Sequence, residues 1–160
     1  MTQAPHPFSG HAPALVVGEA GVLIEGASGS GKSALALACI EAARAAGRFA
    51  CLISDDRVRL LPRAGRLIAS AHPVTAGQIE RRGLAIESST FCSQAVLRLV
   101  AGMVSSPAET AALPRLPWEE ARSTRICGIS LPFLPLDANR DRADQVALVF
   151  AALGSATFQD

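Results

Sequence analysis

The residues with the clearest capacity for chemistry lie between positions 26 and 33, where the chain reads GASGSGKS. This stretch satisfies the pattern G-x-x-x-x-G-K-[ST], whose glycines let several backbone N–H groups converge on one anionic centre. In such loops the lysine reaches the β- and γ-phosphates of a nucleotide, and the final hydroxyl can bind Mg²⁺. Lys32 is the only lysine among 15 basic residues, since the chain otherwise uses arginine. The predicted ATP-binding residues are Gly26, Ala27, Ser28, Gly29, Ser30, Gly31, Lys32 and Ser33.

Two adjacent carboxylates, Asp55 and Asp56, follow the apolar run FACLIS at residues 49–54. An acid at the end of a buried strand can organise Mg²⁺ in nucleotide-binding proteins. Two neighbouring acids also allow one to orient its neighbour or serve the metal while the other takes a proton from a substrate hydroxyl. The alternative is an ordinary turn, in which aspartate is common. With the glycine-rich loop upstream, we interpret the pair as catalytic.

A third group, Glu80, Arg81 and Arg82, precedes Gly83 and a short apolar run. A carboxylate and a guanidinium beside a nucleotide could share metal and phosphate contacts. Taken alone, the stretch is equally consistent with the start of a strand that carries solvated charges. His11 is also ambiguous alone, because a single loop histidine is more often structural or solvated than catalytic.

Composition narrows the class of protein. The 160 residues suit one domain, and 49% hydrophobic residues can build a substantial core. A formal net charge of +1, with no tyrosine, argues against a nucleic-acid surface. The four cysteines form no C-x-x-C pair, which favours reduced thiols. No signal-peptide core or membrane-length apolar run is present, so we expect a soluble, cytoplasmic protein without a membrane partner.

Alternating short apolar runs and two helical patterns predict the elements that position these residues. We expect an α/β fold in which a mixed sheet carries flanking helices. Residues 1–10 are expected to form a flexible lead, and residues 11–160 a single catalytic domain. The predicted strands are 14–18, 22–26, 49–54, 57–61, 66–70, 95–101 and 125–136, the last until its prolines end pairing; the predicted helices are 33–46 and 139–153, and 102–124 is an exposed connection.

These motifs together resemble the C-terminal catalytic domain of the HPr kinase/phosphorylase family. The resemblance rests on His11, 21 residues before Lys32, on GVLIEGASGSGKSALAL, on LISDDRV, and on IERRGLAI at residues 79–86. It covers roughly residues 11–86, and the motifs agree in order and spacing as well as in residue type. It implies a P-loop kinase fold similar to that of phosphoenolpyruvate carboxykinase, and assembly into hexamers.

The resemblance also implies an activity and a role for each residue. Family members transfer the γ-phosphoryl of ATP to a serine of the phosphocarrier HPr, and also run phosphorolysis, in which inorganic phosphate attacks phosphoserine and pyrophosphate leaves. Asp56 would be the base in one direction and the acid in the other, as reversibility requires. Ser33 and Glu80 would hold Mg²⁺, and His11 would assist near the transferred group. The remaining catalytic residues implied by the resemblance are Lys32, Arg82 and Arg122, with Arg125 as the alternative to Arg122.

Several positions depart from the family pattern. Ala34 stands where a glutamate often follows the loop serine, and Ala85 replaces a glycine of the conserved stretch. Only about ten residues precede His11, where typical members carry a further domain. The late segment associated with phosphorolysis is reduced to PLDANRD at residues 135–141 and lacks its glycine. The sequence therefore supports the kinase direction better than phosphorolysis.

Two other functions fit the phosphate-binding pattern. A P-loop kinase of a small metabolite would share the loop and could use the arginine-bearing segment 57–66 as a lid. A regulatory module would bind ATP and change conformation or assembly without turning it over.

Overall fold

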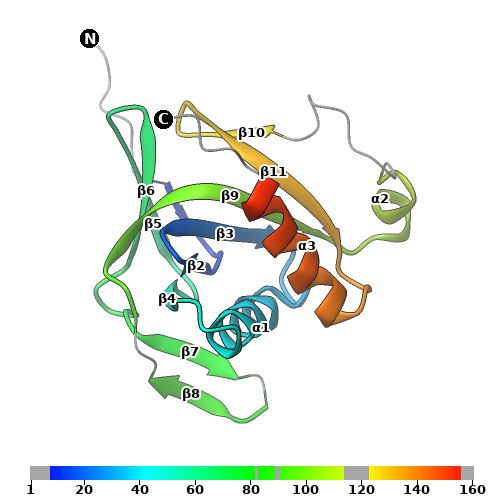
Figure 1. Ribbon diagram of the computed structural model, residues 1–160, viewed down its shortest axis with the longest axis horizontal. Coiled ribbons are helices and arrows are strands. Elements are labelled where there is room, and N and C mark those ends of the chain that lie inside the picture. Colours follow the sequence, from blue (N-terminus) through cyan, green and yellow to red (C-terminus); the bar gives the residue numbers. More distant parts are fainter. Residues whose placement is uncertain (1–7, 82, 89–90, 114–122, 156–160) are drawn as a thin grey trace.

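The computed structural model describes residues 8–81, 83–88, 91–113 and 123–155 as a mixed α/β fold (Figure 1). The strands are β1 Phe8–Gly10, β2 Ala14–Val17, β3 Ala20–Gly26, β4 Ala50–Ser54, β5 Val58–Arg63, β6 Arg66–Ala71, β7 Gln78–Arg81, β8 Ala85–Ser88, β9 Gln94–Val104, β10 Ser123–Ile126 and β11 Ile129–Asp137. The helices are α1 Lys32–Ala45, α2 Pro107–Ala111 and α3 Arg142–Ser155.

Nine of the described strands form one mixed sheet, as the sequence predicted. Its main path runs β1-β5-β6-β9-β3-β2-β4, with β11 beside β9 and β10 beside β11, while β7 and β8 form a separate hairpin. The pairs β3–β9 and β9–β11 are parallel, and the other pairs in this sheet are antiparallel. The sheet therefore combines a parallel centre with antiparallel flanks.

Strand direction brings distant segments to one edge of the sheet. Strand β2 is antiparallel to both β3 and β4, so β3 and β4 point the same way. Gly26, at the end of β3, and Asp55, just after β4, consequently lie at the same edge. Because β2 runs in the opposite direction, its first residue, Ala14, also lies at that edge, opposite Leu23 and Ser54. His11 precedes this start by three residues.

Two apolar cores hold the sheet. Helices α1 and α3 pack on one face, where buried residues of β2, β3, β4 and β9 contact Leu35, Cys39 and Val149 (Figure 1). The second core joins the other face of the central strands to β5, β6, β10 and β11. The polar positions Glu41 and Arg44 lie on the exposed side of α1.

The structure corrects several expectations from the sequence. Residues 8–10, expected in the flexible lead, form β1 and pair with β5. Pro132 and Pro135 do not end pairing: both lie within β11, opposite Ser123 and Gly102. Beyond residue 132 β11 pairs with β9 alone among the described strands, and an open strand side tolerates a missing N–H.

The third correction concerns the connections. Strand β9 continues to Val104, and α2 follows, within the segment expected to be an exposed connection. The proposed lid, 57–66, is instead largely the β5–β6 hairpin of the main sheet. No helix among the described residues is long and apolar enough to span a membrane.

Candidate active site

Residues 26–33, which we call the phosphate loop, connect β3 directly to α1. Two glycines are required by its geometry. A Cβ on Gly26 would lie 2.8 Å from the Cβ of Met103, and Gly31 caps α1 with a φ of 94°. Other residue types would clash or be strained at these positions. The loop therefore presents backbone at the N-terminus of α1, where unpaired N–H groups attract anions.

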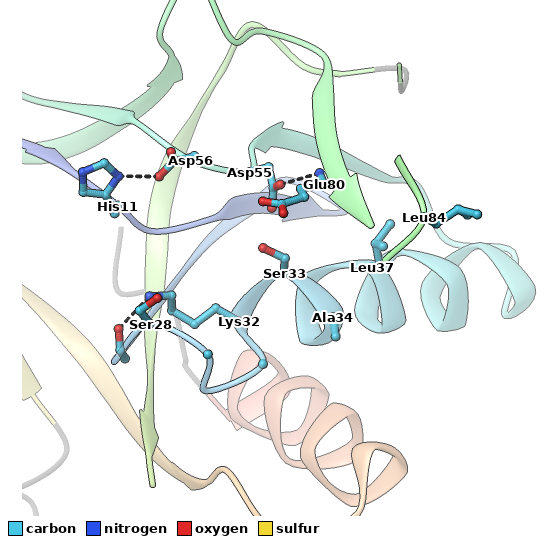
Figure 2. A pocket seen from close by; sticks show the side chains of 13 residues that line it. His11, Ser28, Lys32, Ser33, Ala34, Leu37, Asp55, Asp56, Glu80 and Leu84 are labelled. Atoms are coloured by element: carbon cyan, nitrogen blue, oxygen red, sulfur yellow. Dashed lines mark hydrogen bonds and ion pairs between the residues drawn. The ribbon is translucent and has the colours of Figure 1, made fainter. Parts of the chain in front are cut away.

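Lys32 is the first residue of α1, and its side chain turns back across the loop. Its Nζ donates to the carbonyl of Gly26 over 2.6 Å, which joins the two ends of the loop (Figure 2). The ammonium is thus held against the backbone of the loop. Ser33, the next residue, directs its hydroxyl toward Asp55 and Glu80 in the same view.

Asp56 is paired with His11 at the edge of the sheet. The Nδ1 of His11 lies 2.7 Å from Oδ1 of Asp56, although 45 residues separate them. Both side chains are open to solvent, with relative exposures of 81% and 53%. The Ser54 hydroxyl donates to the Asp56 carbonyl, which fixes the backbone at this position. Asp56 is thus oriented by its neighbours and remains accessible to a substrate.

Asp55 points in a different direction and contacts the β7–β8 hairpin. Its Oδ2 accepts a hydrogen bond of 2.8 Å from the backbone N–H of Glu80. Its Oδ1 is buried and has no hydrogen-bond partner among the described residues. A buried carboxylate oxygen without a partner is costly, so its position favours a bound cation or donor. The two aspartates therefore have separate surroundings, consistent with separate roles.

A single pocket of about 1060 Å³ joins the loop to these acids (Figure 2). Its lining residues are His11, Gly26, Ser28, Gly29, Gly31, Lys32, Ser33, Ala34, Leu37, Asp55, Asp56, Glu80 and Leu84. The phosphate loop and the acids thus face one space that has room for a nucleotide.

The structure brings together His11, Lys32, Asp55, Asp56 and Glu80. Arg82 and Arg122, the other two residues predicted to be catalytic, lie outside the described residues. Arg125, the alternative to Arg122, donates instead to the Gly128 carbonyl in the β10–β11 turn, over 3.2 Å.

Sequence reasoning missed the apolar end of the pocket, formed by Ala34, Leu37 and Leu84. The signals were weak but present. Leu37 is one helical turn beyond Ser33, on the same face of α1, and Leu84 directly follows the glycine of the ERRG stretch. Both are leucines, and an apolar pattern alone does not separate pocket residues from core residues.

Glu25, immediately before the phosphate loop, is a further titratable group near the site. Burial raises the pKa of its carboxyl above the ordinary value of 4.5. It pairs with Gly102 of β9 in the parallel centre of the sheet. Burial therefore disfavours the ionised form of this carboxyl.

Comparison with known proteins decides the family. Residues 6–153 match the family described as the HPr Serine kinase C-terminal domain. The chain belongs to this family. A protein named HPr kinase/phosphorylase from Mycoplasma mycoides subsp. mycoides is 37% identical over 76 residues, which cover 48% of this chain and 22% of that protein. The match thus spans about a fifth of that relative's own length.

A solved structure of the HPr(Ser) kinase/phosphatase from Coxiella burnetii extends the likeness to the whole fold. It superposes with a TM-score of 0.69 at 26% identity, covering 91% of this chain and 95% of that one. The resemblance inferred from motifs in residues 11–86 therefore extends through the second half of the HPr kinase family domain, where the sequence carries few family motifs.

Proposed function

We propose that this domain is a Mg²⁺- and ATP-dependent serine kinase whose substrate is HPr or an HPr-like phosphocarrier protein. The observation that carries the proposal is that the phosphate loop and the Asp56–His11 pair face one pocket. A loop that only binds nucleotide needs no accessible carboxylate oriented beside it. A kinase needs both, because positioning and charge neutralisation supply most of phosphoryl-transfer catalysis.

Asp56 is the proposed proton acceptor. As the serine oxygen of the substrate attacks the γ-phosphorus of ATP, its proton passes to the Asp56 carboxylate and ADP leaves. In phosphorolysis inorganic phosphate attacks the phosphorus of phosphoserine, and the bond to the serine oxygen breaks as pyrophosphate forms. Asp56 takes the proton of the attacking phosphate and gives it to the departing serine oxygen. His11 orients Asp56 through the 2.7 Å contact. The altered segment 135–141 supports the kinase direction more strongly than the reverse reaction.

The donor set fits a magnesium ion. Mg²⁺ is commonly bound by one or two carboxylates, a hydroxyl and substrate phosphates rather than by an all-protein cage. Among the described residues no group of three or more His, Cys, Asp or Glu is arranged as such a cage. Ser33 and Glu80 would hold the ion, and the unpartnered Oδ1 of Asp55 adds a third donor. When bound, Mg²⁺ would neutralise charge on the β- and γ-phosphates.

Transfer of labelled phosphate tests the proposal directly. The protein would be incubated with [γ-³²P]ATP, Mg²⁺ and purified HPr, and the labelled residue would be mapped by mass spectrometry. We expect label on one serine of HPr. An HPr variant with that serine changed to alanine serves as the control and should remain unlabelled. Labelling of a histidine, or of no HPr residue, would contradict the proposed activity.

The same assay separates the two other functions. Small hydroxyl compounds replace HPr in parallel reactions, and labelled product there alone would indicate a metabolite kinase. The embedding of the β5–β6 hairpin in the sheet removes the proposed lid and disfavours that alternative. Tight ATP binding without transfer to any acceptor would indicate a regulatory module.

Three further proposals concern location, assembly and partners. We place the protein in the cytoplasm, where reduced thiols are expected, and its four cysteines form no disulfide. We also propose a homo-oligomer, a hexamer by likeness to the family, and no nucleic-acid partner. Sedimentation velocity at several protein concentrations would test the assembly.

A further inference from the structure

Arg142, which lies outside every motif identified in the sequence, contacts the phosphate loop. Arg142 is the first residue of α3, and its Nη1 donates to the carbonyl of Gly31 over 3.3 Å, across 111 residues of chain. A Cβ on Gly31 would lie 2.7 Å from Nη2, so the guanidinium lies directly against this glycine. Arg142 is not among the described residues that line the pocket. It therefore touches the loop without lining the pocket.

The arginine is itself held in place. Its Nη1 also donates to Oε1 of Gln145 over 2.7 Å, and Nε2 of Gln145 donates to the carbonyl of Asp137 over 2.8 Å. Gln145 is fully buried. A buried amide with both ends bonded has a fixed orientation, so it fixes the guanidinium in turn. The chain of contacts runs from the end of β11 through α3 to the start of α1.

The bonded carbonyl belongs to the peptide group that carries the N–H of Lys32. A trans peptide is planar, and its C=O and N–H point in opposite directions. The Gly31 carbonyl also accepts from the N–H of Leu35 over 3.0 Å, as the first bond of the helix. Holding this carbonyl on the α3 side therefore aims the Lys32 N–H toward the phosphate side. Gly31 has a φ of 94° and no side-chain cap, and the contact with Arg142 adds a second restraint to the one that the Leu35 bond supplies.

The charge of Arg142 also acts on the interior of α1. Burial raises the pKa of the Cys39 thiol to about 12, and the positive charge of Arg142 partly opposes that rise. A cation that is effective within α1 adds to the electropositive N-terminus of the helix. Both its hydrogen bond and its charge thus favour an anion at the phosphate loop.

We propose that Arg142 is a positioning residue for the phosphate loop, held by Gln145, and that it sets nucleotide affinity without touching substrate. The proposal deepens the proposed kinase function and rests on it. It predicts that α3 and the segment before it are coupled to ATP binding.

Substitution of both partners tests the proposal. Arg142→Lys keeps the charge but loses the planar geometry, and Gln145→Leu removes the amide that orients it. We expect Arg142→Lys to weaken Mg²⁺–ADP binding, measured by calorimetry, about 10- to 100-fold. The KM for ATP should rise in parallel, while the KM for the protein substrate stays within about twofold. Gln145→Leu should have a smaller effect, and the double variant should lose less than the two losses combined.

A matched control removes a different arginine contact with α3. The guanidinium of Arg48 lies 5.3 Å from the ring centroid of Phe150 on the same helix. Arg48→Gln should leave ADP affinity unchanged. The thermal unfolding midpoint of this variant measures how much the loss of a contact with α3 destabilises the fold. The proposal would be overturned if Arg142→Lys bound ADP as tightly as the wild type. It would also be overturned if Arg48→Gln lost as much ADP affinity as Arg142→Lys, or if the effects of the Arg142 and Gln145 substitutions were additive. Binding of ADP needs no acceptor, so failure of HPr phosphorylation alone leaves this test intact; a wild-type protein that bound no nucleotide would overturn both.

Discussion

The phosphate loop and the acidic cluster, which comprises His11, Asp55, Asp56 and Glu80, share one pocket but are built differently. The loop is eight consecutive residues between a strand and a helix, and its shape follows from local backbone geometry. The cluster is assembled from three separate segments whose contacts span 45 and 25 residues. The proposed nucleotide-binding loop is thus encoded locally, whereas the proposed transfer site depends on the sheet. Substitutions in the loop should therefore weaken nucleotide binding, whereas substitutions in the cluster should lower the rate of transfer.

Asp56→Asn should give the largest effect, because it removes the proposed proton acceptor and keeps the side-chain shape. We expect a fall of about 10²- to 10⁴-fold in kcat for HPr phosphorylation. Affinity for Mg²⁺–ATP, measured by calorimetry, should remain close to that of the unaltered protein. Asp144→Asn, an exposed acid on α3, is the control. Full transfer activity in Asp56→Asn would remove this residue from the mechanism.

Lys32→Ala should produce the opposite pattern, in which the main loss is in nucleotide affinity. The variant loses the one ammonium in the loop, and a charged hydrogen bond to phosphate is worth about 10- to 100-fold in affinity. Its KM for ATP should rise accordingly, and equilibrium binding of ADP should show the same loss. Comparison with Asp56→Asn separates binding from chemistry. A Lys32→Ala protein that binds and turns over ATP normally would show that the loop does not hold the phosphates.

His11→Gln should have a moderate effect, since His11 acts through Asp56. The pair is exposed, and exposed ion pairs contribute about 0.2–1 kcal/mol, so we expect a two- to fivefold fall in kcat. In the background of Asp56→Asn the same substitution should change nothing further. This double-variant comparison, made by steady-state kinetics, distinguishes the pair from two independent residues. Additive losses would mean that His11 contributes separately from Asp56.

Glu25→Gln should give the smallest effect, on stability rather than on catalysis. The pKa of Glu25 is raised in the folded protein, so the folded state holds its proton more tightly than the unfolded chain. Stability from this group is present at low pH and is lost as pH rises through the raised pKa. The glutamine variant avoids that loss, so its thermal midpoint should exceed that of the wild type at neutral pH and match it near pH 4. Glu19→Gln, in the exposed β2–β3 turn, is the control for replacing a glutamate by glutamine.

The sequence by itself determined the phosphate loop, the flanking strand and helix, and the mixed α/β character. These depend on residues close in the chain, whose spacing directly fixes local backbone geometry. It also singled out Asp55, Asp56 and Glu80, but only resemblance to a family related them to one another and to His11. The catalytic roles expected for Arg82 and Arg122 stay predictions, and both residues lie outside the described residues.

Only the tertiary structure decided which distant residues meet. The antiparallel placement of β2 between β3 and β4 brings His11 within 2.7 Å of Asp56, and no local pattern encodes that pairing. The same holds for the contact of Arg142 with Gly31, and for the prolines that lie within β11. The physical reason is that strand order and direction are set by burial of whole faces. A one-dimensional pattern reports which residues prefer burial, but not which face their neighbours share.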